Sequence, residues 1–126
     1  MAHQSKSPSR FCLDKITGYL VGKYCPPKGV SVLDVGCGEG EYCLYFISRK
    51  CQGKYFGIDI LKSPSWQNRI ENGLEISYAV YDAQNLENLA QSFNFIISIQ
   101  SLEHIEDDKK AMRGINKCLA GEGVLL

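Results

Sequence analysis

Short apolar runs alternate along the chain with stretches in which apolar side chains recur every three or four residues. The runs are rich in β-branched and aromatic residues and are short, which is typical of buried strands. We predict strands over residues 30–35, 54–60, 75–81 and 93–99, and the start of a fifth strand at residues 124–126. The stretches between them predict helices over residues 11–24, 41–50, 65–71 and 106–119, with a weaker helical turn at residues 86–90.

Two local signals set the ends of these helices. Pro26 and Pro27 prevent the first helix from continuing, and Gly121 is in position to cap the last one. Strands that alternate with helices, each strand apolar on both faces, predict an α/β fold in which a parallel sheet is covered on both sides. Because the chain ends inside the fifth strand, we expect it to be the N-terminal portion of a longer protein.

Composition limits the chain to one domain. It has 126 residues, of which 44% are hydrophobic, enough for one core. Residues 1–9 are polar and predict a disordered leader, so the domain is expected over residues 10–126. Fourteen Lys and Arg balance fourteen Asp and Glu, which disfavours a nucleic acid or a membrane as partner and leaves the oligomeric state open.

The cysteines follow no metal-binding pattern. All six lack C-x-x-C spacing, and the chain has two histidines, so we expect no metal site. No export signal or long apolar segment is present, which favours the cytoplasm, reduced thiols and small buried cysteine side chains.

The first strand leads directly into a glycine turn, Gly36-Cys-Gly38-Glu-Gly40, which opens the next helix. Glycines there let the backbone turn sharply and let a ligand lie against main-chain N–H groups. Glu41 stands where a dinucleotide fingerprint has its third glycine, and Glu39 adds a second negative charge, so an uncharged or cationic ligand suits the turn better than a pyrophosphate. The alternative is a glycine turn that binds nothing.

Carboxylates follow the next two strands. Asp59 comes nineteen residues after Gly40, where an acceptor can hold both hydroxyls of a ribose. Asp82 ends the third strand, where it can accept the exocyclic amine of an adenine. A solvated, loop-capping aspartate is the alternative at either position. Polar sites after three consecutive parallel strands predict a binding crevice at the carboxyl edge of the sheet.

The order VLDVGCGEG, GIDI, YDAQNL and FNFIISIQSLEHIED resembles class I S-adenosylmethionine-dependent methyltransferases, in particular the small-molecule group with an LEH motif. The resemblance implies a Rossmann-like sheet of order 3-2-1-4-5, without the last two strands of the usual seven. It also implies S-adenosylmethionine as the cofactor. The cofactor-binding residues that it implies are Asp34, Gly36, Cys37, Gly38, Asp59, Ile60, Asp82, Ala83 and Gln100.

His104 is the candidate catalytic residue. A sulfonium methyl group is already activated, so the enzyme mainly positions the acceptor, and a general base contributes when the acceptor is a hydroxyl. Glu103 or a backbone carbonyl would orient His104, and the alternative is a structural histidine beneath the loop. The spacing Gln100-x-x-Glu103-His104 also resembles the metal site of RNA 2′-O-methyltransferases, but Gln100 replaces a charged ligand, which disfavours a metal.

We therefore predict methyl transfer from S-adenosylmethionine to a small molecule at oxygen, carbon or nitrogen. The alternatives are an inactive cofactor-binding partner module, an enzyme like the RNA 2′-O-methyltransferases, and a nicotinamide dehydrogenase. Glu41 argues against the dehydrogenase.

Overall fold

One six-stranded sheet organises the chain. In a computed structural model that describes residues 7–26, 28–99 and 101–126, the strands stand in the order β3-β4-β2-β1-β5-β6. Their bounds are β1 Val30–Val35, β2 Gly53–Asp59, β3 Arg69–Glu71, β4 Leu74–Val80, β5 Phe93–Ile97 and β6 Leu119–Leu125. Neighbours pair in parallel except β3 and β4, which are antiparallel. The predicted α/β class and the order 3-2-1-4-5 are confirmed, with β3 added beside the predicted third strand.

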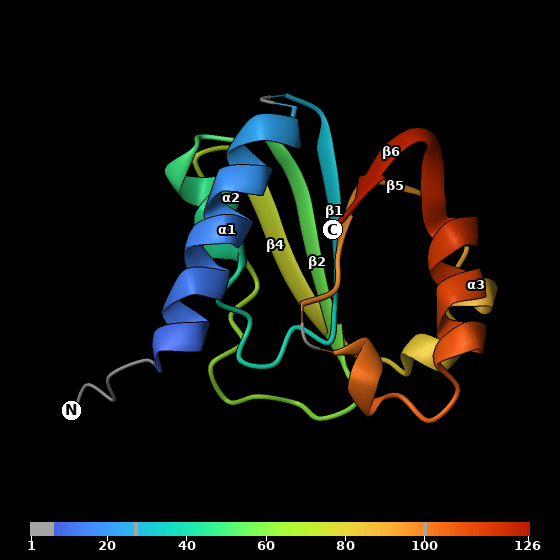
Figure 1. Cartoon of the computed structure of the whole chain (residues 1–126). Coiled ribbons are helices and arrows are strands. Elements are labelled where there is room, and N and C mark those ends of the chain that lie inside the picture. The colour runs from blue at the N-terminus through green and yellow to red at the C-terminus, as the bar shows by residue number, and fades with distance from the viewer. Residues whose placement is uncertain (1–6, 27, 100) are drawn as a thin grey trace.

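Helices cover both faces of the sheet (Figure 1). Helices α1 (Pro8–Tyr24) and α2 (Cys43–Ser48) lie on one face, and α3 (Asp108–Cys118) lies on the other with the 3₁₀ helix η1 (Ala83–Asn88). A second 3₁₀ helix, η2, spans Leu102–His104.

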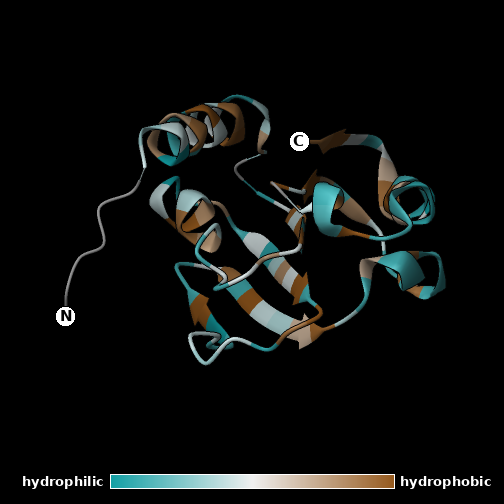
Figure 2. Cartoon of the chain, turned by 60° about the horizontal axis from the view of Figure 1, so that its bottom comes forward, coloured by the Kyte–Doolittle hydropathy of each residue, from teal (hydrophilic) through white to brown (hydrophobic). Residues whose placement is uncertain are grey.

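The central strand is buried on both sides because its side chains alternate between two cores. Val32 packs with Val21 of α1 and Phe46 of α2, whereas Leu33 and Val35 belong to the cluster that includes Ile115 of α3. Figure 2 shows hydrophobic residues, in brown, recurring along the strands between white and teal bands. This two-sided burial explains the continuous apolar runs of the sequence.

Helix α1 begins earlier than the predicted residue 11. Ser7 is its N-cap and accepts the backbone N–H of Arg10, and Pro8 occupies the first turn, where its missing N–H costs nothing. The helix therefore starts within the predicted leader, of which residues 1–6 lie outside the described residues.

The predicted helix over residues 65–71 is wrong. Arg69–Glu71 is strand β3, which forms a hairpin with β4 through Asn72 and Gly73. Both turn residues have positive φ, 51° and 84°, as a two-residue hairpin turn of the right-handed twist requires. The Asn-Gly pair is a strong hairpin signal, and it outweighs the helical spacing of so short a segment.

Gly121 does not cap the last helix. Helix α3 ends at Cys118, the N–H of Leu119 bonds to the carbonyl of Ile115, and Gly121 lies within β6. The fifth strand thus begins at Leu119, five residues before its predicted start.

Strand register gathers the carboxyl ends of the central strands at one edge. Val35 of β1 pairs with Ile58 of β2, and Asp59 of β2 pairs with Val80 of β4. The loops that follow β1, β2 and β4 therefore leave the sheet side by side, which is where ligands bind in open α/β sheets. No helix among the described residues has the length and apolar character needed to cross a bilayer.

Candidate functional site

A cavity of about 450 Å³ opens at the carboxyl ends of β1, β2 and β4. Six of the predicted site residues line it: Gly36, Asp59, Ile60, Asp82, Ala83 and His104. They come from four separate parts of the chain, so the fold alone brings them together. The remaining wall is formed by Val35, Ile58, Tyr81, Gln84, Ser101, Ile105 and Glu106.

A second cavity of about 290 Å³ adjoins the glycine turn. It shares Gly36 with the first cavity, and its lining consists of Arg10, Gly36, Cys37, Gly38, Glu39, Glu41, Tyr42 and Ile99. The predicted residues Cys37 and Gly38 therefore lie here. The two cavities flank one residue of the turn, so an elongated ligand can occupy both.

The glycine turn is fixed by its own backbone. The N–H groups of Gly36 and Cys37 both donate to the carbonyl of Ile58, at 2.9 Å each, which joins the end of β1 to β2. Gly36 has φ of 71°, and a Cβ on it would lie 2.3 Å from the Cβ of Ser101. Glycine is needed at this position for both reasons.

Asp59 joins the end of β2 to the glycine turn. Its Oδ2 accepts the Gly38 N–H at 2.9 Å, and its Oδ1 accepts the Leu61 N–H at 3.2 Å. Each carboxylate oxygen has more than one lone pair, so Asp59 can still accept hydroxyl groups from a ligand in the first cavity. The same side chain thus holds the turn and faces the cavity.

Asp82 caps the 3₁₀ helix η1. Its Oδ1 accepts the Gln84 N–H at 2.9 Å, which fixes the loop between β4 and η1. Ala83 is buried beside it, and both residues line the first cavity. The exposed Ile60 contributes an apolar side chain to the same wall.

Asp34 lines neither cavity. Its side chain is fully buried, Tyr55 of β2 donates a hydrogen bond to its Oδ2, and its Oδ1 has no hydrogen-bond partner. The pKa of Asp34 is raised from its ordinary 3.8 to about 7, chiefly by burial and to a smaller extent by the charge of Asp59, while the Tyr55 hydroxyl acts in the opposite direction. The structure therefore places this predicted cofactor contact behind the turn, inside the core shared with Tyr55.

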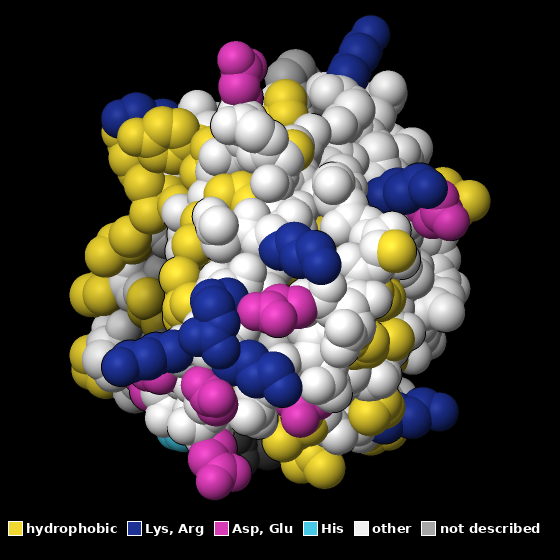
Figure 3. All heavy atoms as spheres, turned by 90° about the vertical axis from the view of Figure 1, so that its right-hand side faces the viewer, with side chains coloured by type: hydrophobic (Ala, Val, Ile, Leu, Met, Phe, Trp, Pro, Cys, Tyr) yellow, Lys and Arg dark blue, Asp and Glu magenta, His cyan; other side chains and the backbone are white. Residues whose placement is uncertain are grey.

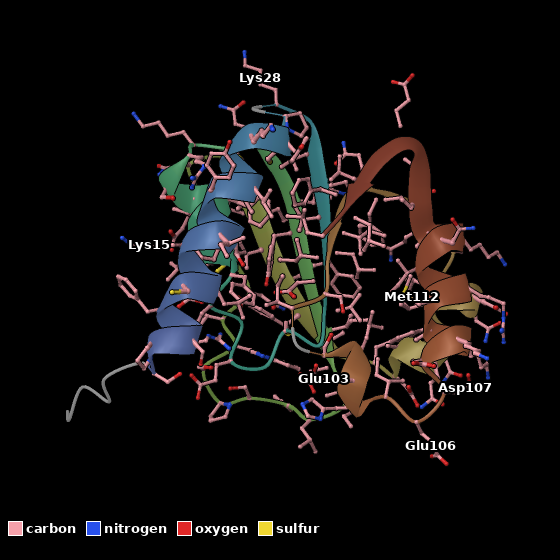
Figure 4. All side chains as sticks on the ribbon, viewed as in Figure 1. Lys15, Lys28, Glu103, Glu106, Asp107 and Met112 are labelled. Atoms are coloured by element: carbon pink, nitrogen blue, oxygen red, sulfur yellow. The ribbon has the colours of Figure 1, made fainter. Side chains whose placement is uncertain are left out.

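His104 stands at the mouth of the first cavity, in η2. Its side chain is 78% exposed, and its Nε2 lies 3.5 Å from Oε1 of Glu103. Figure 4 shows Glu103 and Glu106 at the end of the molecule where the central strands finish. Gln100, the remaining predicted residue, lies outside the described residues.

Sequence reasoning missed several wall residues. Ser101 links two strand ends, because its Oγ donates to the Val35 carbonyl at 2.9 Å and lies 2.5 Å from the Ser98 Oγ. Arg10 reaches the second cavity from α1 and forms an ion pair with Asp14 at 3.3 Å. Ser101 follows the fourth predicted strand and was detectable by that rule, whereas the position of Arg10 depends on how α1 packs.

Among residues 7–26, 28–99 and 101–126, no three His, Cys, Asp or Glu side chains gather where a metal ion could be held. Four of the six cysteines are buried, as expected, but Cys12 is exposed and Cys25 is half-buried. Cys12 lies on the solvent-exposed side of α1.

A protein-family model described as a methyltransferase domain matches residues 1–126. The chain belongs to this methyltransferase-domain family. Among curated relatives, the ubiquinone biosynthesis O-methyltransferase of Bartonella bacilliformis is 26% identical over 108 residues, which cover 79% of this chain and 41% of the relative. The methyltransferase domain described here thus spans less than half the length of that relative.

Solved structures agree on the fold of this methyltransferase domain. The cyclase SpnF superimposes with a TM-score of 0.77 at 23% identity, covering 98% of this chain and 47% of that one. The magnesium protoporphyrin IX methyltransferase of Synechocystis, solved with bound S-adenosylmethionine, gives a TM-score of 0.63 at 17% identity, covering 92% of this chain and 61% of that one. At identities of 23% and 17%, these likenesses concern the fold alone. One of the two proteins is named for a different reaction, a cyclisation.

Proposed function

We propose that this methyltransferase domain binds S-adenosylmethionine across the two cavities and transfers its methyl group to a small-molecule acceptor. The observation that carries the proposal is the pair of cavities that meet at Gly36, with the carboxylates of Asp59 and Asp82 in one and the guanidinium of Arg10 in the other. S-adenosylmethionine has a nucleoside at one end, an amino acid at the other and the sulfonium between them, which matches two cavities joined at Gly36.

The first cavity suits the adenosyl part. Asp59 accepts hydrogen bonds from ribose hydroxyls, and Asp82 accepts the exocyclic amine of adenine. Ile60 covers the apolar face of the ring, and the Ala83 N–H is placed to donate to a ring nitrogen. All four residues line this one cavity.

The second cavity suits the amino-acid part. Arg10 supplies a guanidinium that can pair with the carboxylate of the ligand, and Glu39 and Glu41 can pair with its ammonium group. The negative charges of Glu39 and Glu41 also disfavour a pyrophosphate at the turn, because like charges repel. This repulsion argues against a nicotinamide cofactor.

When bound, S-adenosylmethionine supplies a methyl group that is already electrophilic. The residues of the domain then hold the acceptor in line and exclude water. His104 is placed to take the proton of a hydroxyl acceptor, with Glu103 at 3.5 Å to stabilise the charged ring. For a carbon or nitrogen acceptor that is already nucleophilic, positioning alone is sufficient.

A small acceptor fits the site better than a nucleic acid does. Figure 3 shows Lys and Arg side chains over the α3 face mixed with Asp and Glu, and Arg113 pairs with Glu87 at 3.4 Å. Such a surface has no single-sign field for a phosphate backbone. The relative that acts in ubiquinone biosynthesis and the neighbour named for magnesium protoporphyrin also take small molecules. We also propose a cytoplasmic location, because free cysteines are typical of a reducing compartment.

Calorimetric titration of the full-length protein tests the proposal. We expect saturable binding of S-adenosylmethionine and of its demethylated product, and no binding of NAD. Binding of NAD but not of S-adenosylmethionine would identify a dehydrogenase instead.

A second measurement separates an enzyme from an inactive binding module. The protein is incubated with methyl-labelled S-adenosylmethionine and either a mixture of small metabolites or RNA, and we expect label in one of the metabolites. Binding without transfer to any metabolite, or transfer to RNA only, would contradict the proposed acceptor class.

A further inference from the structure

Three consecutive carbonyl groups of the glycine turn each accept a hydrogen bond from a different side chain. The Trp66 Nε1–H donates to the Gly38 carbonyl at 2.8 Å, and the Ser65 Oγ–H donates to the Glu39 carbonyl at 2.8 Å. The Tyr78 hydroxyl donates to the Gly40 carbonyl at 2.9 Å. We call Ser65, Trp66 and Tyr78 the carbonyl clamp.

The clamp is built from two elements on one side of the turn. Ser65 and Trp66 belong to the loop between β2 and β3, and Tyr78 lies in β4. The rings of Trp66 and Tyr78 are stacked, with centroids 5.5 Å apart and an interplanar angle of 11°. This stack joins the loop to the sheet, so the donors are held in place by packing as well as by their own bonds.

The clamp sets the direction of the backbone N–H groups. In a planar trans peptide, the C=O of one residue and the N–H of the next point in opposite directions. Carbonyls of Gly38 and Gly40 that point at the clamp therefore turn the N–H groups of Glu39 and Glu41 away from it. Glu39 and Glu41 line the second cavity, which no clamp residue does, and they also line a third cavity of about 180 Å³ together with Ser65 and Tyr78. The peptide geometry thus directs their N–H groups to the second cavity rather than to the third.

We propose that the carbonyl clamp positions the glycine turn for the amino-acid end of S-adenosylmethionine, by aiming the amides of Glu39 and Glu41 at the second cavity. Ser65, Trp66 and Tyr78 are positioning residues, because none of them lines either of the two cavities. This inference rests on the proposed binding of S-adenosylmethionine. It gives the loop between β2 and β3 a role in ligand affinity, although the loop lies behind the turn.

Variants that remove single donors test the clamp. In the full-length protein, Ser65→Ala and Trp66→Phe each delete one donor, and each should raise the Kd for S-adenosylmethionine by about three- to tenfold. Ser65→Thr keeps the hydroxyl and should restore the affinity. Ser48→Ala is the matched control, because the Ser48 Oγ also donates to a backbone carbonyl, that of Tyr45, but on α2 and away from the turn.

Adenosine, which has no amino-acid end, separates positioning from a general structural effect. We expect the Kd for adenosine to change less than about twofold in Ser65→Ala and Trp66→Phe, because adenosine occupies the first cavity alone. Equal losses for both ligands, or no loss for either, would overturn the clamp while leaving the proposed function intact. Failure of the parent protein to bind S-adenosylmethionine would instead overturn the proposed function.

Two further measurements report on the glycine turn. Ser65 holds the Glu39 carbonyl, and the N–H of the same peptide, that of Gly40, donates to the Cys37 carbonyl at 2.9 Å. Amide hydrogen exchange at Gly40 should therefore become faster in the ligand-free Ser65→Ala variant, and unchanged exchange would contradict the clamp. Trp66 is the single tryptophan of the chain, so its fluorescence reports directly on the turn. S-adenosylmethionine should change this emission in the parent protein, and an unaltered emission at saturation would count against contact between clamp and ligand site.

Discussion

Asp34 and Asp59 show how position decides what a carboxylate does. Asp34 is fully buried, with Tyr55 as its hydrogen-bond donor, whereas Asp59 is half-buried, accepts two backbone N–H groups and lines the first cavity. The residues lie on neighbouring strands and close to the same sheet edge. Burial lets the first keep its proton well above the pH at which an ordinary aspartate loses it, and partial exposure lets the second accept hydrogen bonds from a ligand in the cavity.

The raised pKa of Asp34 predicts that stability falls as the pH rises. Between pH 3.8, the ordinary pKa, and about pH 7, the folded value, the unfolded chain releases this proton while the folded chain keeps it. The contribution of Asp34 to the free energy of unfolding is thus greatest below that window and is lost above it. Asp34→Asn removes the titration, so its stability relative to the parent should rise by about 2 to 4 kcal/mol across the window.

Urea unfolding of the parent and of Asp34→Asn, from pH 4 to pH 8, measures this difference. Tyr55→Phe is an informative companion, because the loss of the donor should move the window of pH dependence upward. Parallel pH profiles of the parent and Asp34→Asn would show that Asp34 does not titrate in this range.

The prediction about catalysis concerns His104. If it takes the proton of a hydroxyl acceptor, His104→Gln should lower kcat by about a hundredfold or more, while the Kd for S-adenosylmethionine stays within about threefold. Kinetics and calorimetry on the same preparation give both values. A variant with the parent's kcat would remove His104 from the mechanism and assign it to the surface of η2.

At the scale of elements, apolar runs identified four strands because both faces of the sheet are covered. The same rule could not find β3, whose alternate side chains face solvent: Ile70 is 73% exposed. The hairpin is encoded in its turn, Asn72-Gly73, rather than in its hydrophobicity. Patterns of burial and patterns of turn chemistry are separate signals, and the helix predicted at residues 65–71 came from using just the first.

The candidate site was predictable where it follows strand ends. Asp59 is the last residue of β2 and Asp82 lies two residues beyond the end of β4, so sequence order alone places them at one edge of a parallel sheet. Arg10 was not predictable, since it reaches its cavity through the packing of α1. Asp34 was assigned from motif likeness, which does not show to which face of β1 its side chain points.

The turn after β1 carries a stability prediction at this scale. Gly36→Ala places a Cβ in a backbone of φ 71° and 2.3 Å from the Cβ of Ser101, so we expect a loss of about 2 to 4 kcal/mol in the free energy of unfolding. Gly121→Ala is the matched control, because a Cβ there meets no atom within 4 Å. Urea unfolding compares them, and similar stabilities would mean that the turn relaxes around the added methyl group.

At the scale of the whole molecule, one site is divided between two cavities that different parts of the chain build. The first depends on the loops after β2 and β4, and the second depends on α1 and the glycine turn. The affinity for adenosine therefore tests the first cavity alone, and its comparison with the affinity for S-adenosylmethionine tests the second.

This division predicts distinct effects of two variants. Asp59→Ala should lower the affinity for both S-adenosylmethionine and adenosine by tenfold or more, because a charge-assisted hydrogen bond contributes about 1.5 to 3 kcal/mol. Arg10→Ala should lower the affinity for S-adenosylmethionine by a similar factor and leave the affinity for adenosine unchanged, since Arg10 lines the second cavity and not the first. Calorimetry with both ligands checks this, and a loss of adenosine binding in Arg10→Ala would contradict the division.

The place of β1 in the middle of the sheet has a consequence for synthesis on the ribosome. One edge of β1 pairs with β2, but the other edge pairs with β5, which is translated more than fifty residues later. Until then the nascent strand has one open side, and the His104–Glu106 wall of the first cavity arrives later still. During that interval the ligand has no complete pocket to bind, so ligand binding cannot protect the open strand against aggregation.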